Sequence, residues 1–242
     1  MRTPFTVVDA RTGMSPQQFI ADFSASTWLS PEARLRLRSV MCRAASRVGI
    51  LEVDDSQGFF ALRFTAAREH CSFAECREIV SDVCNAYAFE RVESRFASHM
   101  LEALFEAERY VHGRGDADGV LHEAMNSVVL ATGSAIIANA LLCRTIGRRR
   151  LRIAAPVDTG FGTITFSHGT FELPAPATRY LLTTRSIPCI SRLPGERVTP
   201  TGAALLVTLR CFGADYTPLA CEPAACFALP RNPLAGAATG LR

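Results

Sequence analysis

The sequence predicts an α/β (or α+β) fold in which helices pack on a mixed sheet within one large domain. A β-rich run, FTVVD at Phe5 to Asp9, leads into a turn and a helical pattern, which is how an α/β layer often begins. Capped helical segments then fill the chain as far as Leu142, and strand-like runs alternate with helices after Leu151. With 242 residues, of which 48% are hydrophobic, the chain is long enough and apolar enough to bury a large core.

The first elements are predicted from their ends and their periodicity. Pro16 to Ser24 is a helical pattern that follows a Thr-Gly turn. Ser30-Pro31-Glu32 is typical of an N-cap, a proline at the first helical position and an acid in the first turn, and it predicts a helix that runs to Val48 and stops at Gly49. Apolar and polar residues alternate from Gly58 to Thr65, so we expect a strand there.

The middle of the chain predicts three longer helices. Ser72 and Glu75 match a capping box, which opens a helix as far as about Ala86. Apolar residues at helical spacing from Glu90 to His112 form a core stripe that ends at a glycine-containing loop. From His122 to Leu142 the apolar residues go nearly all the way round, so we expect a long, buried helix that begins at His122.

The last third of the chain predicts shorter elements. We expect strands at Arg152 to Val157 and at Thr163 to Ser167, and a helix that Pro174 to Thr178 introduces. Thr199 to Gly202 leads into a further helix, which ends at Phe212. After residue 217 the chain is rich in Pro, Ala and Gly without clear periodicity. We therefore expect one domain over 1–217 and an irregular tail over 218–242.

Composition excludes several classes of partner. A net charge of +3 is too small to demand a nucleic acid. The one basic run, Arg144 to Arg152, is interpreted as cations that complement the carboxyl end of the preceding helix, with phosphate binding as the alternative. No uninterrupted apolar run reaches the roughly 18 residues of a membrane span. We expect a soluble protein that binds neither membranes nor nucleic acid.

Nine cysteines are spread over the chain, and we expect no signal peptide before them, because polar and charged residues run through Met1 to Gly13. Their odd number and wide spread favour reduced, buried thiols in a cytoplasmic protein. Cys71 and Cys76, like Cys221 and Cys226, have a spacing that structural zinc sites also use, so zinc stays an alternative for these two pairs.

Five segments, taken in order, resemble a known family. They are VVDARTGMSPQQF (7–19), EAERYVHG (106–113), LHEAMNSV (121–128), HGTFELPAPATRYLL (168–182) and GERVTPTGAALL (195–206). The combination of PAPAT with TPTGAALL is similar to the paired signature of LarC-type nickel insertion proteins. The likeness covers nearly the whole chain.

The resemblance implies an activity, cofactors and partners. Members of the family insert nickel into pyridinium-3,5-bisthiocarboxylic acid mononucleotide, in a CTP-dependent step that leaves a nickel–carbon bond, and a lactate racemase uses the product. The expected enzyme is a CTP-dependent nickel chelatase or cyclometallase, a lyase. CTP and its divalent metal are associated with a further C-terminal domain in the family, so we expect CTP use here only through such a domain or through a separate chain that supplies it.

The resemblance also implies a set of site residues. The expected catalytic residues are Asp9, His122 and Glu123. The expected metal ligands are His112, His122 and His168. Substrate contacts are expected from His168, Thr199, Thr201 and Gly202. Imidazole and carboxylate groups are ligands that nickel prefers, and a helix N-terminus beside a glycine suits a phosphate.

Most of these residues also have a structural interpretation. His122 at a helix start suits a cap, His112 in a last helical turn suits the helix dipole, and His168 suits a turn. One of Thr199 and Thr201 is expected to be an N-cap whose hydroxyl accepts a bond from a free amide. Adjacent helical residues point about 100° apart, so His122 and Glu123 do not normally share one metal.

Several positions depart from the family's pattern. Pro16-Gln17 stands where the family has Gly-Asp, Val120 replaces a histidine, Asn126 and Leu130 stand near the places of two aspartates, and only His70 is kept of a histidine-rich stretch. Most of these changes remove a metal ligand or a charge. The alternative function is therefore that of a non-catalytic descendant, which keeps the fold as a binding or scaffolding module.

Overall fold

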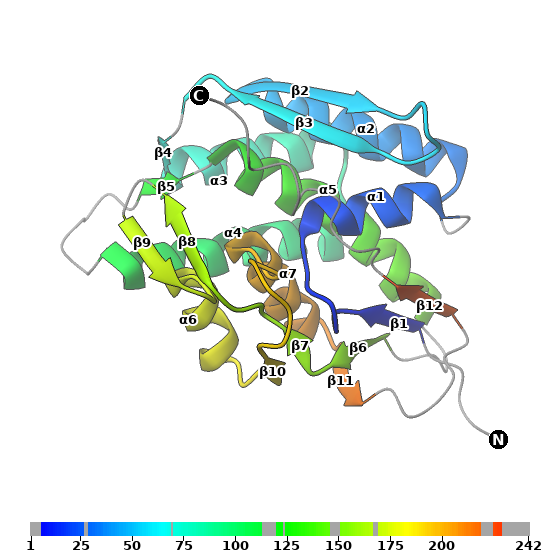
Figure 1. Ribbon diagram of the computed structural model, residues 1–242. Coiled ribbons are helices and arrows are strands. Elements are labelled where there is room, and N and C mark those ends of the chain that lie inside the picture. Colours follow the sequence, from blue (N-terminus) through cyan, green and yellow to red (C-terminus); the bar gives the residue numbers. More distant parts are fainter. Residues whose placement is uncertain are drawn as a thin grey trace.

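The computed structural model describes residues 6–26, 29–68, 70–112, 120–122, 124–145, 151–166, 169–218 and 225–228 (Figure 1). Its helices are α1 (Pro16–Ala25), α2 (Pro31–Ala45), α3 (Phe73–Ala86), α4 (Arg91–His112), α5 (Ala124–Thr145), α6 (Pro176–Thr184) and α7 (Pro200–Cys211). Its strands are β1 (Thr6–Asp9), β2 (Gly49–Asp54), β3 (Ala61–Ala66), β4 (His70–Ser72), β5 (Val120–His122), β6 (Leu151–Ala155), β7 (Val157–Asp158), β8 (Thr163–Phe166), β9 (Gly169–Glu172), β10 (Cys189–Ile190), β11 (Asp215–Pro218) and β12 (Ala225–Ala228).

Four parallel strands form the main sheet, in the order β11, β6, β1, β12. The antiparallel strands form separate pairs, β2 with β3, β4 with β5 and β8 with β9, while the short β7 and β10 pair in parallel. Figure 1 shows the β2–β3 hairpin along α2 at one end of the molecule and the parallel sheet at the other. The α/β prediction is confirmed, with parallel and antiparallel strands divided among separate small sheets.

Helix α5 is the centre of the helical part, because it packs against α1, α2, α3, α4 and α7. Its segment Ala124–Leu142 is long and apolar enough to cross a membrane, but 83% of that window is buried inside the fold. A helix with neighbours on every side needs apolar residues all the way round, so this composition is that of a core helix. At Gly133 the neighbours pack closely, since an added Cβ would lie 2.9 Å from Met41 Sδ and 3.0 Å from Ile20 Cδ1.

The caps predicted for the helices are largely confirmed. Ser30 accepts a hydrogen bond from Ala33 N at 3.2 Å, and Ser72 and Glu75 form both bonds of the capping box. The end predicted for α2 is wrong: the helix ends at Ala45, and Gly49 opens strand β2 instead. A Cβ at Gly49 would lie 2.4 Å from Thr65 O, so close strand packing, rather than a helix stop, requires this glycine.

Two further strands lie where the sequence predicts other structure. β12 (Ala225–Ala228) falls within the segment 218–242, for which irregular structure is predicted, and it pairs in parallel with β1. Four residues are too few to show a periodicity, and the pairing comes from β1. His122, predicted at the start of a helix, lies in β5, and α5 begins at Ala124. Its capping interpretation is therefore wrong.

Candidate functional site

A cavity of about 350 Å³ lies where α4 ends and where α1, α5, α6 and α7 begin. We call it the His112 cavity. Its polar lining residues among those described are Ser15, Gln17, Glu108, His112, Asn126, Ser127, Glu196, Thr199 and Thr201. Leu121 of β5 and Ile164 of β8 also line it. Three expected site residues, His112, Thr199 and Thr201, are thus brought together from positions up to 89 residues apart.

His112 is positioned by the last turn of α4 and by Glu108 one turn earlier. Its Nε2 lies 3.2 Å from Oε2 of Glu108, and both side chains are largely buried. A carboxylate and an imidazole this close together offer two donor groups to the same cation. The pair therefore suits cation binding as well as the helix-dipole role expected for His112.

The first turns of α6 and α7 meet at the same cavity. Thr199 is the N-cap of α7 and accepts a hydrogen bond from Gly202 N at 3.0 Å. Thr201 is the second threonine of this turn, and its hydroxyl lies 3.0 Å from that of Thr199. Ala175, the N-cap of α6, makes no side-chain cap. Two helix N-termini at one cavity favour a negatively charged ligand group.

Gly202 has a structural reason of its own. A Cβ at this position would lie 2.0 Å from Met14 O, on the turn that joins β1 to α1. Met14 N donates to Arg197 O at 2.8 Å, so the turn after β1 and the segment before α7 are held tightly together. The glycine is required by this backbone contact, which the sequence did not reveal, and it is not among the residues that line the cavity.

Asp9 is not brought to the His112 cavity. Its carboxylate is 8% exposed and forms a two-pronged ion pair with Arg11, at 2.6 Å to Nη2 and 2.9 Å to Nε. The N–H of Arg11 also donates to Asp9 Oδ1 at 3.1 Å. These bonds hold the turn that follows β1.

The structure describes less of the remaining expected site residues, which are His122, His168 and Glu123. His122 pairs in register with His70 across β4 and β5, which brings the backbones of two histidines together although 52 positions separate them. His168 falls between β8 and β9, and it lies outside the described residues, as does Glu123. Among the described residues, no three His, Cys, Asp or Glu side chains are grouped so as to hold a metal ion.

Sequence reasoning missed two acidic residues of the cavity, Glu108 and Glu196. The spacing of Glu108 and His112, four apart on a predicted helix, was a usable signal for the first of them.

Asp158 helps to hold the segment that leads to Glu196. The buried Oδ1 of Asp158 accepts hydrogen bonds from Gly160 N at 3.0 Å and from Arg192 N at 3.2 Å.

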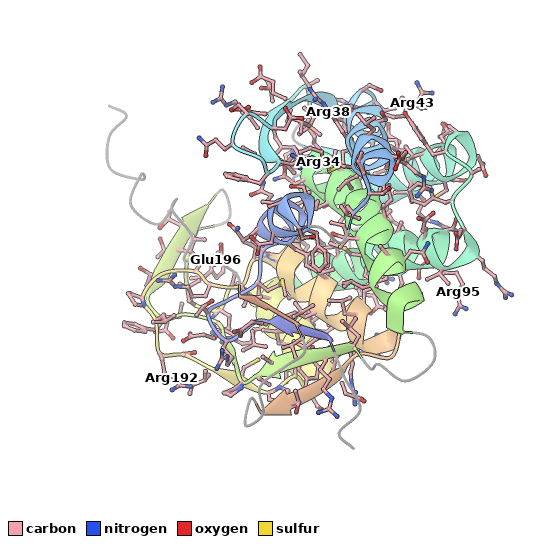
Figure 2. The ribbon with its side chains drawn as sticks, turned by 90° about the vertical axis from the view of Figure 1, so that its right-hand side faces the viewer. Arg34, Arg38, Arg43, Arg95, Arg192 and Glu196 are labelled. Atoms are coloured by element: carbon pink, nitrogen blue, oxygen red, sulfur yellow. The ribbon has the colours of Figure 1, made fainter. Side chains whose placement is uncertain are left out.

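Among the described residues that line the cavity there are two glutamates and no Lys or Arg. Figure 2 shows Glu196 on the segment that leads to α7, well away from Arg34, Arg38 and Arg43 of α2. The cavity therefore offers carboxylates and an imidazole to a cation, and helix N-termini to an anionic group.

The chain is similar in sequence to a known protein family over most of its length. The sequence model of a family described as nickel insertion protein matches residues 6–226. The pyridinium-3,5-bisthiocarboxylic acid mononucleotide nickel insertion protein of Akkermansia muciniphila is 32% identical over 145 residues, which cover 59% of this chain and 33% of the relative. A protein of the same name from Thermotoga petrophila is 39% identical over 115 residues, which cover 47% of this chain and 28% of the relative.

No solved structure matches the chain significantly. The chain spans about a third of the length of the curated relatives it matches. The family match, by contrast, covers nearly the whole chain, from β1 through the His112 cavity to β12. On this match, the chain belongs to the nickel insertion protein family.

Proposed function

We propose that this protein binds a nickel ion and a pyridinium mononucleotide in the His112 cavity and passes the metal to the sulfur atoms of the nucleotide. The observation that supports this most directly is the convergence of the Glu108–His112 pair with the first turns of α6 and α7. The relatives' names supply the substrate, a pyridinium-3,5-bisthiocarboxylic acid mononucleotide. Nickel is the cargo of this reaction.

The cation side of the cavity suits a transfer site. Glu108 and His112 provide one carboxylate and one imidazole, both of which nickel accepts as ligands. Two protein donors leave most of the coordination sphere open, so sulfur donors of the substrate are able to take over the metal. A closed site with four protein ligands would hold nickel too tightly for transfer. We further propose that His122 of β5 and His168 contribute to the metal site, and that Glu123 acts as a proton acceptor.

The anion side suits the nucleotide. Thr201 and the first turn of α6, which has no side-chain cap, both line the cavity, and the N–H groups at a helix N-terminus favour phosphate or carboxylate. The volume of about 350 Å³ falls within the range of roughly 300–1,000 Å³ found for small-molecule sites. We propose that Thr201 contacts the substrate directly, while Thr199 and Gly202 shape the turn and Asp9 holds the neighbouring one.

We assign the CTP-dependent step, with its divalent metal, to a further domain or a separate chain. The stretch that this chain shares with its relatives is only about a third of their length, which leaves room in them for such a domain. The work of the His112 cavity is then to hold and align the metal and the nucleotide.

The proposal is tested by isothermal titration of tag-free protein with nickel chloride and with nicotinic acid mononucleotide, a stable pyridinium mononucleotide. We expect nickel binding that weakens as pH falls, because a protonated imidazole is not a ligand. His112→Ala should weaken nickel binding at least ~10-fold, as loss of one ligand does. His99→Ala is the matched control, because His99 contacts Thr208 outside the cavity.

The two threonines separate ligand binding from capping. Thr201→Val keeps the shape of the side chain and should weaken nucleotide binding with little change in stability. Thr199→Ala should lower the free energy of unfolding by about 1 kcal/mol, since it removes the cap of α7. Wild-type protein that binds neither ligand would leave the scaffolding module as the function, and nickel binding unchanged in His112→Ala would remove this metal site.

A further inference from the structure

A second hollow, of about 500 Å³, lies where α6 and α7 end and where β6 and β11 begin. It is lined by Arg152, Arg185, Ser186, Arg210, Asp215 and Thr217, together with two further residues. None of these residues lines the His112 cavity. Helix α7 has 12 residues, so its two ends are roughly 18 Å apart and the two sites are distinct.

The hollow gathers positive charge. Three guanidinium groups reach it from three elements, whereas Asp215 is the one carboxylate in its described lining and lies 2.7 Å from Arg210. Nη2 of Arg185 lies 3.8 Å from Oε2 of Glu106, a long ion pair in which both side chains are about half exposed. Burial raises the pKa of the phenol of Tyr216, so this lining residue adds no negative charge. Cations brought together in this way repel one another unless an anion lies between them.

Helix ends account for only part of this arrangement. Arg185 is the C-cap of α6 and Arg210 lies in the last turn of α7, where cations complement the helix dipole. Arg152 lies on strand β6 and belongs to neither helix, and its Nη1 approaches the Thr217 hydroxyl at 3.5 Å. A helix-dipole role does not explain why this third guanidinium faces the same hollow.

Ser186 adds a hydroxyl at a costly backbone position. It follows α6 with a φ of 50°, and Ser186 N and Ile187 N bond back to Thr183 O and Leu182 O at 3.1 and 3.0 Å. This is the motif in which glycine is the usual residue, as Gly213 is at the end of α7. Ala88 occupies the same position after α3, away from the hollow, and so provides an internal control.

We propose that this hollow binds a phosphate group, carried as inorganic phosphate or as the phosphomonoester of a small molecule, between Arg152, Arg185, Ser186 and Thr217. The planar guanidinium group donates two parallel hydrogen bonds to a phosphate, and hydroxyls donate a third and a fourth. The volume exceeds what the ion itself fills, which leaves room for an attached organic group. This site goes beyond the proposed nickel function and does not depend on it.

The test is titration of the intact, tag-free protein with inorganic phosphate and with glycerol 3-phosphate at constant ionic strength. Arg185→Gln, an exposed change at a helix end, should weaken binding of both probes at least ~10-fold, the size expected for one charge-assisted contact. Arg152→Gln should do the same. Tighter binding of glycerol 3-phosphate assigns the site to a phosphomonoester, and equal binding assigns it to free phosphate.

Ser186→Gly gives the sharpest comparison, because its two effects have opposite signs. It should raise the melting temperature by relieving the left-handed backbone, yet weaken phosphate binding a few-fold by removing the hydroxyl. Ala88→Gly should raise the melting temperature in the same way and leave phosphate affinity unchanged.

Three results would overturn the site. One is wild-type protein that binds neither probe at tens of millimolar concentration. Another is affinity that stays unchanged in Arg185→Gln and Arg152→Gln. The third is binding that persists in those variants but is lost in Thr201→Val, which would place the phosphate in the His112 cavity instead.

Discussion

In the turn that starts α7, neighbouring residues have different roles. Thr199 and Thr201 have the same side chain two positions apart and both line the His112 cavity, but only Thr199 is the N-cap of α7. Glu108 and His112, one turn of α4 apart, likewise line the same cavity but offer it different donors, a carboxylate and an imidazole. A role assigned to one residue therefore does not extend to its neighbour in sequence.

Asp22 on α1 should make stability depend on pH. Burial raises the pKa of its carboxyl to about 6, against a hydrogen bond from Gln18 Nε2 at 2.8 Å. Its Oδ2 is buried without a hydrogen-bond partner in the described part of the chain. Because the pKa is higher in the folded state than in the unfolded one, the carboxyl contributes stability below about pH 4, and this contribution is lost as pH rises through about 6.

We therefore predict that Asp22→Asn raises the free energy of unfolding at pH 7.5 by on the order of 1 kcal/mol, since it removes the charge that burial disfavours. Urea unfolding at pH 4.5, 6 and 7.5 measures this, and the gain should shrink toward pH 4.5. Equal pH slopes in the variant and the wild type would contradict the assignment.

At the scale of elements, one buried ion pair joins three helices. Glu93 of α4 is 2% exposed and binds Arg36 of α2 through two bonds of 2.7 Å. Asn139 of α5 donates to the same carboxylate at 3.3 Å, and Glu90 N donates at 2.9 Å. Burial alone would raise the pKa of Glu93, but the bonds from Arg36 and the backbone hold that pKa below its ordinary value.

Removing one partner should cost much more than removing both. Arg36→Ala should lower the free energy of unfolding by about 2–4 kcal/mol, because it leaves a buried carboxylate without its cation. The double variant Arg36→Met, Glu93→Leu should recover most of this loss. Denaturant unfolding measures both, and Arg63→Ala, which breaks an exposed pair with Glu52, is the control with an expected change within about 0.5 kcal/mol.

The same pair sets a pH dependence of opposite sign to that of Asp22. With its pKa depressed, Glu93 contributes stability above its ordinary pKa, and this contribution is lost as pH falls through the folded value. In Arg36→Ala, the free energy of unfolding should therefore fall less steeply as pH is lowered into the acid range. The same fall in the free energy of unfolding with pH in the variant and the wild type would show that the Arg36–Glu93 pair does not control stability in acid.

At the scale of the whole molecule, the thiols report on global unfolding. The six cysteines whose side chains the structure describes are free, as the sequence predicts. The predicted burial holds for Cys71 and Cys76, but Cys189 and Cys211 are exposed. Burial raises the pKa of Cys76 to about 12, whereas Cys211 is exposed. No grouping of metal-ligating side chains includes the Cys71–Cys76 pair in the described part of the chain, so the zinc alternative finds no support there.

We predict that pulse labelling with iodoacetamide at pH 8 modifies Cys211 in the folded protein but Cys76 only after unfolding. The reason is that only an accessible thiolate reacts. Peptide mass spectrometry along a urea series measures both, and the midpoint for Cys76 should equal that of the circular dichroism transition. Labelling of Cys76 together with Cys211 without urea would contradict the buried position.

Local patterns were enough for much of the fold. Caps such as Ser30 and the Ser72–Glu75 box depend on residues three apart, so the chain itself encodes the starts of α2 and α3. The all-round apolar surface of α5 also predicts its central burial. The short strands β4, β5 and β12 were not predictable in this way, because three or four residues carry no period and each is formed by its partner strand.

The sequence by itself determined the helices, the family and the residue types available for binding a metal and a nucleotide. Only the tertiary structure decided which of them meet: His112, Thr199 and Thr201 line one cavity, Asp9 is bound to Arg11, and Gly202 is packed against Met14. The physical reason is the range of the interactions. Capping and periodicity act within one or two turns of the chain, whereas a cavity arises where helix ends distant in sequence pack together, and no local pattern encodes that meeting.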